Sequence, residues 1–323
     1  MQIQEYRFHC RFTSPARLPG YPGSTLRGAL GWALKKTCCV LRNKECQDCL
    51  LRDQCAYGWL FATEAYTGSK GQRVNARPHP LVIRPEPAAK MELQAGDPLR
   101  FSMLLFGRGN DYLPHLVHAV RHMGRSGIGQ GRGQGMGRFA VQQVTAGGET
   151  CFSSSDDILK RPSVLRELSL DPAGTARAGA IRCTLLTPLR LKRGNRLQLD
   201  LPFAELIRAC LRRVSALEAA YGSGEPELDY AGLIEEAEKI RITNSEVRWQ
   251  ELFRWSNRQR KTISLAGLAG TCVYAGGLTP FLPLLTYCQE VHIGKQTIFG
   301  LGRMAILPEK EPETGPEEKK TIR

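Results

Sequence analysis

Four closely spaced cysteines form the clearest chemical pattern in this sequence. Cys39, Cys46, Cys49 and Cys55 are separated by six, two and five residues, and thiolates this close in sequence can converge on one tetrahedral ion. Cys38 is an alternative to Cys39 in the set. Four thiolates fill the coordination sphere, so the spacing predicts a structural zinc site. An iron–sulfur cluster is the alternative metal centre, and separate thiols or a redox pair is the alternative without metal.

Two glycine-rich segments could bring backbone amides against an anion. In residues 124–137, GRSGIGQGRGQGMG, seven of the fourteen residues are glycine. A chain without Cβ atoms can approach phosphate oxygens closely, and Arg125 and Arg132 would add charge. The alternative is a flexible linker, which a helical pattern before the segment and a strand pattern after it disfavour. The second segment, residues 294–302, has Lys295 in a turn, and it lacks the upstream glycine and following helix of a P-loop.

The distribution of charge favours a polyanionic partner. The formal net charge is +14. Residues 115–138 and 181–196 each contain several arginines and no acidic residue, although a single patch of this kind is usually solvated surface. In residues 241–261 basic side chains alternate with aromatic ones, which suits phosphate contact with base stacking. Here we expect Trp249 and Phe253 to be core, so the basic residues are the better nucleic-acid candidates.

The elements that position these residues occur in the same order twice. Residues 5–13 alternate as a half-buried strand, and a helical stripe follows from Leu26 to Leu34. Strand patterns at 81–84 and 99–106, a helix at 113–123 and a strand at 139–144 complete the first half. The second half repeats this order from residue 181 to 307. We therefore predict an α+β protein of two tandem ferredoxin-like (RRM-like) β-α-β-β-α-β domains.

The expected domain boundaries follow from this repeat. The first domain should span residues 1–147 and contain a cysteine-rich insert at 38–55, and an irregular linker should occupy 148–178. The second domain should span 179–307 and contain the second glycine-rich loop. The charged end at 308–323 should be disordered. The sequence shows neither a membrane span nor an export signal, which predicts a cytoplasmic protein with reduced thiols.

Several motifs together resemble the CRISPR repeat-RNA processing endoribonucleases of the RAMP superfamily. The resemblance is strongest in the second half, in TPLRLKRG, WSNRQRK, LAGLAGTCVYAGGLTPFLPLL and HIGKQTIFGLGRM. It extends upstream through LRGALGWALKK, CAYGWLF and GRSGIGQGRGQGMGRF. It therefore covers most of the chain apart from the middle boundary and the charged end, and its second-half run is the more specific part.

This resemblance implies paired ferredoxin-like folds that bind a CRISPR repeat and cut one phosphodiester. The attack would be by the RNA's own 2′-hydroxyl, without a catalytic metal, and would give a 2′,3′-cyclic phosphate and a 5′-hydroxyl. The glycine-rich loop before the last strand would contact the RNA. Two departures stand out. The family's loop begins with a glycine where this chain has His292, and the first helix lacks the histidine that many members place near it.

The general base therefore has to be sought among the histidines of this chain. His292 borders the RNA-binding loop and ranks first. His118 and His122 follow, because they lie one helical turn apart just before the other glycine-rich loop. Lys295 would stabilise the pentacoordinate phosphate, and Tyr57 is a more remote proton-transfer candidate. A mechanism without histidine, carried by positioning and positive charge, is a further alternative.

Two functions explain these features. The preferred one is a metal-independent endoribonuclease on CRISPR repeat RNA. The alternative is a non-catalytic subunit that holds the repeat within a CRISPR effector complex. The expected partners are therefore repeat RNA or crRNA and other effector subunits, but no membrane. The expected RNA-binding residues are Gly294, Lys295, Gly300, Gly302, Arg303, Arg125, Arg132, Arg138, Lys192, Arg193, Arg258, Arg260 and Lys261.

Overall fold

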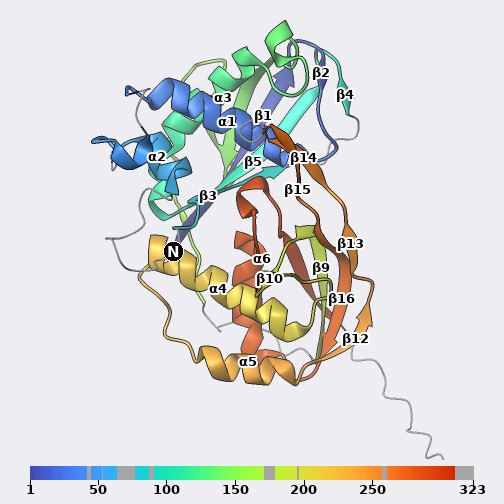
Figure 1. Ribbon diagram of the computed structural model, residues 1–323. Coiled ribbons are helices and arrows are strands. Elements are labelled where there is room, and N and C mark those ends of the chain that lie inside the picture. Colours follow the sequence, from blue (N-terminus) through green and yellow to red (C-terminus); the bar gives the residue numbers. More distant parts are fainter. Residues whose placement is uncertain are drawn as a thin grey trace, which may run out of the picture.

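The first half of the chain forms one antiparallel sheet that two helices cover on one face. In the computed structural model the strands β1 (Gln2–Phe12), β3 (Leu81–Pro85), β5 (Pro98–Phe106), β6 (Phe139–Ala146) and β7 (Glu149–Ser153) are arranged in the order β3-β5-β1-β6-β7. Helices α1 (Gly23–Cys38) and α3 (Leu113–Ser126) pack against each other on this sheet (Figure 1). The structure describes residues 1–41, 45–52, 54–63, 77–86, 91–170, 179–194, 196–256 and 260–309.

The second half repeats this arrangement. Its strands β9 (Ala180–Leu189), β12 (Arg241–Ser245), β16 (Gly267–Ala275) and β17 (Met304–Glu309) lie in the order β12-β16-β9-β17. Helices α4 (Phe203–Tyr221) and α6 (Leu282–Val291) contribute the buried apolar side chains that cover this sheet, and α5 (Tyr230–Glu238) packs on α4. Each half thus has its first strand between its third and its fourth, and the second strand lies outside the third.

Shorter elements join and extend these units. They are β2 (Ala16–Arg17), η1 (Cys46–Asp48), α2 (Ala56–Phe61), β4 (Glu92–Leu93), η3 (Gly107–Tyr112), η4 (Arg132–Gln134), β8 (Arg166–Glu167), β10 (Lys192–Arg193), β11 (Arg196–Leu197), β13 (Arg248–Gln250), β14 (Phe253–Ser256), β15 (Lys261–Ser264), η5 (Thr279–Phe281) and η6 (Thr297–Phe299). None of the helices described is long and apolar enough to cross a membrane.

The expected linker at 148–178 is in part a component of the first sheet, which corrects that boundary. β7 pairs with β6, and β8 pairs with the start of β1. Residues 171–178 lie outside the described part of the chain. At the other end β17 continues to Glu309, two residues beyond the expected end of the second domain, and residues 310–323 are again outside the described part.

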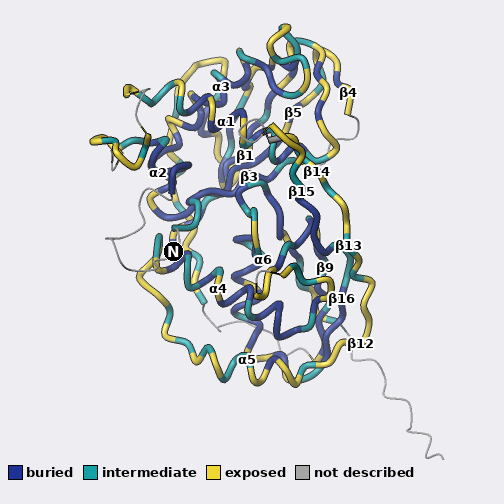
Figure 2. The backbone as a smooth tube through the Cα atoms, viewed as in Figure 1, coloured by how far each residue is buried: buried dark blue, intermediate teal, exposed yellow. Residues whose placement is uncertain are grey.

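The protein has two hydrophobic cores, and the first sheet contributes side chains to both of them (Figure 2). Side chains alternate along a strand, so its two faces can enter different cores. On β3, Ile83 packs in the first core and Val82 in the second. On β1, Tyr6 and Phe8 face the first core, whereas Ile3 belongs to the second. The second half therefore covers the sheet face opposite α1 and α3.

A buried polar network crosses this junction. Arg84 on β3 donates from Nε to Nε2 of His292 at 2.8 Å, and its Nη1 lies 3.2 Å from Oε1 of Glu5 on β1. The same carboxylate oxygen accepts from Ser102 Oγ at 2.6 Å. His292 follows α6 and is fully buried, and its Nδ1 donates to the Leu301 carbonyl at 3.1 Å. The charged side chain of Arg84 in the first half thus holds the end of α6 in the second half in place.

The glycine-rich segment 294–302 is packed into the same junction. Phe299 O accepts from the hydroxyl of Tyr21, which precedes α1, at 2.8 Å. Gly302 has a φ of +73°, and a Cβ there would lie 1.8 Å from the carbonyl oxygen of Ile293. The glycine is therefore required by the backbone conformation and by close packing together.

We expect Gly302→Ala to destabilise the protein much more than Gly148→Ala. Both glycines have positive φ, +73° and +88°, but no atom lies within 4 Å of a Cβ built on Gly148. Gly148→Ala, the control, should therefore lower the free energy of unfolding by about 1 kcal/mol through backbone strain. Gly302→Ala should lower it by about 2–4 kcal/mol, because a backbone carbonyl must also move. Urea unfolding of both variants measures the difference. Equal losses would contradict the packed junction.

We also expect His292 to make stability depend on pH. Burial, and then the positive charge of Arg84, hold the pKa of His292 well below its ordinary value of 6.5. The folded protein keeps this ring neutral while the unfolded chain takes up a proton, so the free energy of unfolding falls as pH decreases below about 6.5. The slope from this group is at most about 1.4 kcal/mol per pH unit.

The matched measurement compares urea unfolding of wild type, His292→Gln and His118→Gln at about pH 7.5 and about pH 5.5. His292→Gln keeps an acceptor for Arg84 but removes the titrating ring, so it should lose part of the acid sensitivity. His118→Gln alters an exposed histidine, and this variant should keep the acid sensitivity of the wild type. An identical pH dependence of wild type and His292→Gln would show that His292 titrates normally in the folded protein.

Candidate nucleic-acid interface

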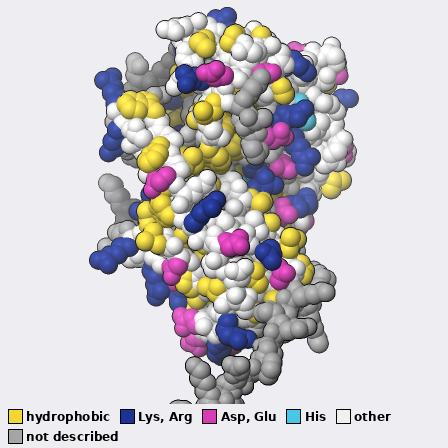
Figure 3. Space-filling view, turned by 90° about the vertical axis from the view of Figure 1, so that its right-hand side faces the viewer, with side chains coloured by type: hydrophobic (Ala, Val, Ile, Leu, Met, Phe, Trp, Pro, Cys, Tyr) yellow, Lys and Arg dark blue, Asp and Glu magenta, His cyan; other side chains and the backbone are white. Residues whose placement is uncertain are grey.

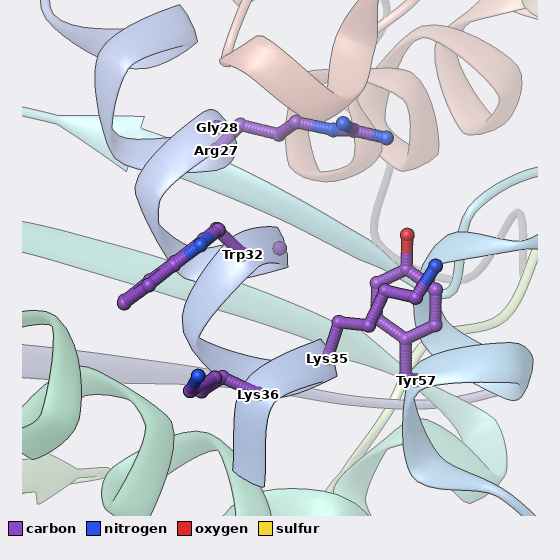
Figure 4. Close-up of a pocket in the computed structure, with 7 residues that line it drawn as sticks. Arg27, Gly28, Trp32, Lys35, Lys36 and Tyr57 are labelled. Atoms are coloured by element: carbon purple, nitrogen blue, oxygen red, sulfur yellow. The ribbon is translucent and has the colours of Figure 1, made fainter. Parts of the chain in front are cut away.

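A pocket on the exposed face of α1 combines three cations with two aromatic side chains. It has a volume of about 290 Å³ and is lined by Arg27, Gly28, Gly31, Trp32, Lys35, Lys36 and Tyr57 (Figure 4). Gly31 is four residues from both Arg27 and Lys35 and is buried against Phe61, whereas Gly28 is exposed and has no atom within 4 Å of a Cβ position. None of the described residues that line the pocket is acidic. It therefore suits an anion such as a phosphodiester.

Helix α2 forms one wall of this pocket. Lys35 Nζ lies 5.6 Å from the centroid of the Tyr57 ring, and the Arg27 guanidinium lies 5.0 Å from that of Phe61. Tyr57 and Phe61 are stacked on each other, with centroids 6.0 Å apart. Figure 4 shows Arg27 and Lys35 reaching towards the side of Tyr57, whereas Trp32 and Lys36 project to the other side of α1.

The first glycine-rich loop reaches the opposite wall. The Arg132 guanidinium lies 4.1 Å from the centroid of the Trp32 ring, and the His122 ring stacks on the same tryptophan at 5.4 Å. The pKa of His122 is lowered, by burial first and then by the charges of His118, Arg125, Lys36 and Arg132. Its Nε2 is buried without a hydrogen-bond partner. The structure thus brings Arg132 and both predicted helix histidines beside the α1 pocket.

His292 is not accessible to a substrate, which argues against it as the general base. It is fully buried, and both ring nitrogens are used within the protein, by Arg84 and by the Leu301 carbonyl. The expectation rested on its position next to the glycine-rich loop, and that position proves to be the inside of the junction. Exposed His118 is the histidine of the predicted set that can still meet a ligand.

The predicted amide cradle at 294–302 is in part used within the fold. The N–H groups of Lys295, Phe299, Gly300 and Gly302 donate to backbone carbonyls of this chain. Lys295 and Arg303 keep exposed side chains at the surface of this segment. Contact with an anion is therefore open to these two side chains rather than to those amides.

The other predicted basic residues are spread over several surfaces. Arg125, Arg138, Lys192, Arg193, Arg260 and Lys261 are exposed, and Arg258 lies outside the described residues. Arg193 forms an ion pair with Glu205 at 2.8 Å. Figure 3 shows one face of the molecule on which basic side chains alternate with acidic and apolar ones, so they do not merge into a single patch there.

A hairpin of the second half presents aromatic side chains that we expected to be less exposed. In β14, Phe253 is 58% exposed and Trp255 is 63% exposed, whereas Arg254 between them turns inward and lies 5.2 Å from the Phe299 ring centroid. The prediction that Phe253 is core was wrong, while Trp249 packs against the second core as expected. Two residues apart on one strand, Phe253 and Trp255 form a surface that suits base stacking.

The predicted metal residues lie beside the pocket. Cys39 immediately follows α1, Cys46 begins η1, Cys49 follows it, and Cys55 immediately precedes α2. All are free thiols, and the described residues contain no preformed cluster of three or more potential metal ligands. The zinc or iron–sulfur site therefore stays a prediction.

Sequence reasoning missed the cations of the pocket. Arg27, Lys35 and Lys36 were visible in LRGALGWALKK, but lysines in the last turn of a helix are usual partners of its carbonyls. A usable signal was the spacing of Gly28 and Gly31 relative to these cations, because small residues at helical spacing leave a depression between long ones.

Comparisons with known proteins agree with this architecture. A family model described as the N-terminal domain AF_1859_N matches residues 1–165, and the model of the CRISPR-associated endoribonuclease Cas6 matches residues 183–304. A protein of Archaeoglobus fulgidus, described as uncharacterized, is 26% identical over 311 residues, which are 94% of this chain and 98% of that protein.

Solved structures with a similar fold include several Cas6 proteins. A Cas6 product complex has a TM-score of 0.56 at 13% identity, covering 95% of this chain and 99% of that one. Cas6 of Thermus thermophilus has a TM-score of 0.54 at 12% identity, covering 95% and 98%. A partial Cas6-RT-Cas1–Cas2 complex has a TM-score of 0.55 at 15% identity, covering 95% of this chain and 46% of that one. The chain belongs to the AF_1859_N family, and its residues 183–304 match the model of the CRISPR-associated endoribonuclease Cas6.

Proposed function

We propose that this protein is an endoribonuclease that cuts CRISPR repeat RNA at the α1 pocket without a catalytic metal. The observation that carries the location is the lining of that pocket, whose described residues include three cations and a tyrosine but no acidic side chain. The match of residues 183–304 to the Cas6 endoribonuclease model supports the reaction class. A repeat hairpin is the substrate that the family resemblance implies.

The proposed reaction is an internal transfer at one phosphodiester. The ribose 2′-oxygen attacks the phosphorus and loses its proton to a base, and the bond from phosphorus to the 5′-oxygen breaks. The leaving oxygen takes up a proton, so the products are a 2′,3′-cyclic phosphate and a 5′-hydroxyl. Negative charge grows on the non-bridging oxygens in the transition state, and fixed cations next to them lower the barrier.

The pocket supplies groups for each of these tasks. Arg27 and Lys35, which reach towards Tyr57, would hold the phosphate and stabilise its charge, and Lys36 would add positive charge on the other side of α1. The Tyr57 hydroxyl is the proton-transfer group on the α2 side of the pocket, and exposed His118 is the corresponding group beyond Trp32. We assign proton transfer to Tyr57, because it is a lining residue of the pocket whereas His118 is not.

We further infer that the two halves are tandem ferredoxin-like units. The support is that the strand order β3-β5-β1-β6 in the first half is equivalent to β12-β16-β9-β17 in the second. In such a pair the exposed side chains of Lys295, Arg303 and the β14–β15 hairpin would guide the RNA towards α1. The non-catalytic alternative, a repeat-binding subunit of an effector complex, uses the same surfaces but predicts that the RNA stays intact.

The decisive experiment incubates repeat RNA with the purified protein in EDTA and identifies the end groups. We expect cleavage at one site with a cyclic phosphate on the upstream fragment. Tyr57→Phe should lower the single-turnover rate constant about 100-fold, and Lys35→Ala by a similar factor, with partial recovery in Lys35→Arg. Lys239→Ala, which alters a cation paired with Glu236 on distant α5, should cleave like wild type.

Binding to a repeat RNA with a 2′-deoxy group at the cut site separates chemistry from affinity, and Tyr57→Phe should bind it normally. Tight binding of unmodified repeat without any cleavage would favour the non-catalytic alternative. A Tyr57→Phe rate within twofold of wild type, together with a slow His118→Ala variant, would transfer the base role to His118.

A further inference from the structure

The segment between α1 and α2 has no hydrophobic core of its own. Among its described residues from 40 to 54 the only side chains that are not exposed are Cys46 and Cys49. Val40 is 76% exposed and Leu50 is 89% exposed. Segments this short cannot bury enough apolar surface to fix their fold and usually need a covalent or metal link. The inward-facing groups here are thiols.

The backbone around these thiols follows a succession of tight turns. The amide of Cys39 donates to Lys35 O at 3.0 Å, that of Cys49 to Cys46 O at 3.4 Å, and that of Cys55 to Leu51 O at 2.9 Å. The turn at Cys46–Cys49 has the Cys-x₂-Cys spacing of zinc sites. Cys39 and Cys55 flank the segment at the ends of the two helices.

The four thiols also share one electrostatic environment. Burial raises the pKa of the Cys46 thiol, Lys35 lowers it, and Cys55, Cys39 and Cys49 each raise it. Cys46 is thus close enough to interact with the three other members of the predicted set. Cys55 and Cys39 also raise the pKa of Cys38, but its sulfur lies 3.7 Å from Thr37 Oγ1 and its side chain packs against the first core.

We propose that Cys39, Cys46, Cys49 and Cys55 bind one Zn²⁺ ion that fastens the end of α1 to the start of α2. Each thiol loses its proton on binding, and the ion holds the four sulfurs in a tetrahedral, closed and structural site. The described residues contain no preformed group of three or more metal ligands, so the proposal rests on the cysteine spacing, the turn at Cys46–Cys49 and the partial burial of these two thiols. Lys35 lies next to Cys46 and would offset the excess negative charge of four thiolates.

The proposed zinc site between α1 and α2 has a consequence for the α1 pocket. Lys35 lies one turn before Cys39, and Tyr57 lies two residues after Cys55. The metal would therefore fix the distance between α1 and the α2 wall of the pocket. Only this consequence depends on the proposed nuclease function, because metal binding itself is measured without RNA.

The test begins with the metal content of the full-length protein purified without chelator. We expect about one zinc per chain in wild type and in Cys38→Ala, and almost none in Cys46→Ser and Cys49→Ser. Cys38→Ala is the matched control, since it removes a neighbouring thiol outside the set. Wild-type protein without zinc, or a Cys49→Ser variant that keeps it, would overturn the proposal. Iron with visible charge-transfer absorption would overturn the choice of ion.

A second measurement on the wild-type chain does not depend on the variants folding. Removal of metal by a strong chelator should make the segment sensitive to trypsin at exposed Arg52, and added zinc should restore protection with release of protons. Unchanged proteolysis with and without zinc would exclude the proposed zinc site. If zinc binds and protects but Cys49→Ser cleaves repeat RNA at the wild-type rate, the site is independent of the nuclease pocket.

Discussion

The structure depends on one buried arginine that connects its two halves. The Arg84 side chain is only 9% exposed, so its charge must be compensated inside the protein. Glu5 provides the counter-charge from the neighbouring sheet strand, and neutral His292 accepts the remaining Nε–H from the other half. A lysine has no planar fork to satisfy both directions at once. The hydrogen bonds of the Arg84 guanidinium therefore fix the orientation of the second half relative to the first.

This junction determines where an RNA can be bound. Because β3 contributes Val82 to one core and Ile83 to the other, the second half occupies the sheet face that α1 and α3 leave open. The helix face with α1 and α3 remains available, and η6 packs against α1 there. The basic pocket and the β14–β15 hairpin both lie next to this contact, since Arg254 reaches the ring of Phe299.

The repeated order of strands and helices was predictable from the sequence because it rests on local periodicity. In β1, Tyr6, Phe8 and Cys10 are buried and Arg7 and Arg11 are exposed, as alternation indicated. Burial of His292 was not predictable. Its neighbours along the chain resemble those of an exposed turn, and only docking of the two halves, which brings Arg84 to it from 208 residues away, removes it from solvent. The error for Phe253 is the opposite one. Its aromatic side chain was expected in the core, but it lies exposed on the β14–β15 hairpin.

The glycine-rich segment 294–302 shows how a correct motif can have a different physical role. Four of its amides donate within the protein, and Gly294, Gly300 and Gly302 lie close to backbone carbonyls, so these glycines serve close packing. Phosphate contact then depends on side chains such as Lys295 and Arg303, which act at longer range and with less directional precision than amides. Binding through such charges releases counterions and weakens steeply with salt. Sequence preference must arise elsewhere, and the exposed rings of Phe253 and Trp255 are the described groups on this surface that can contact bases directly.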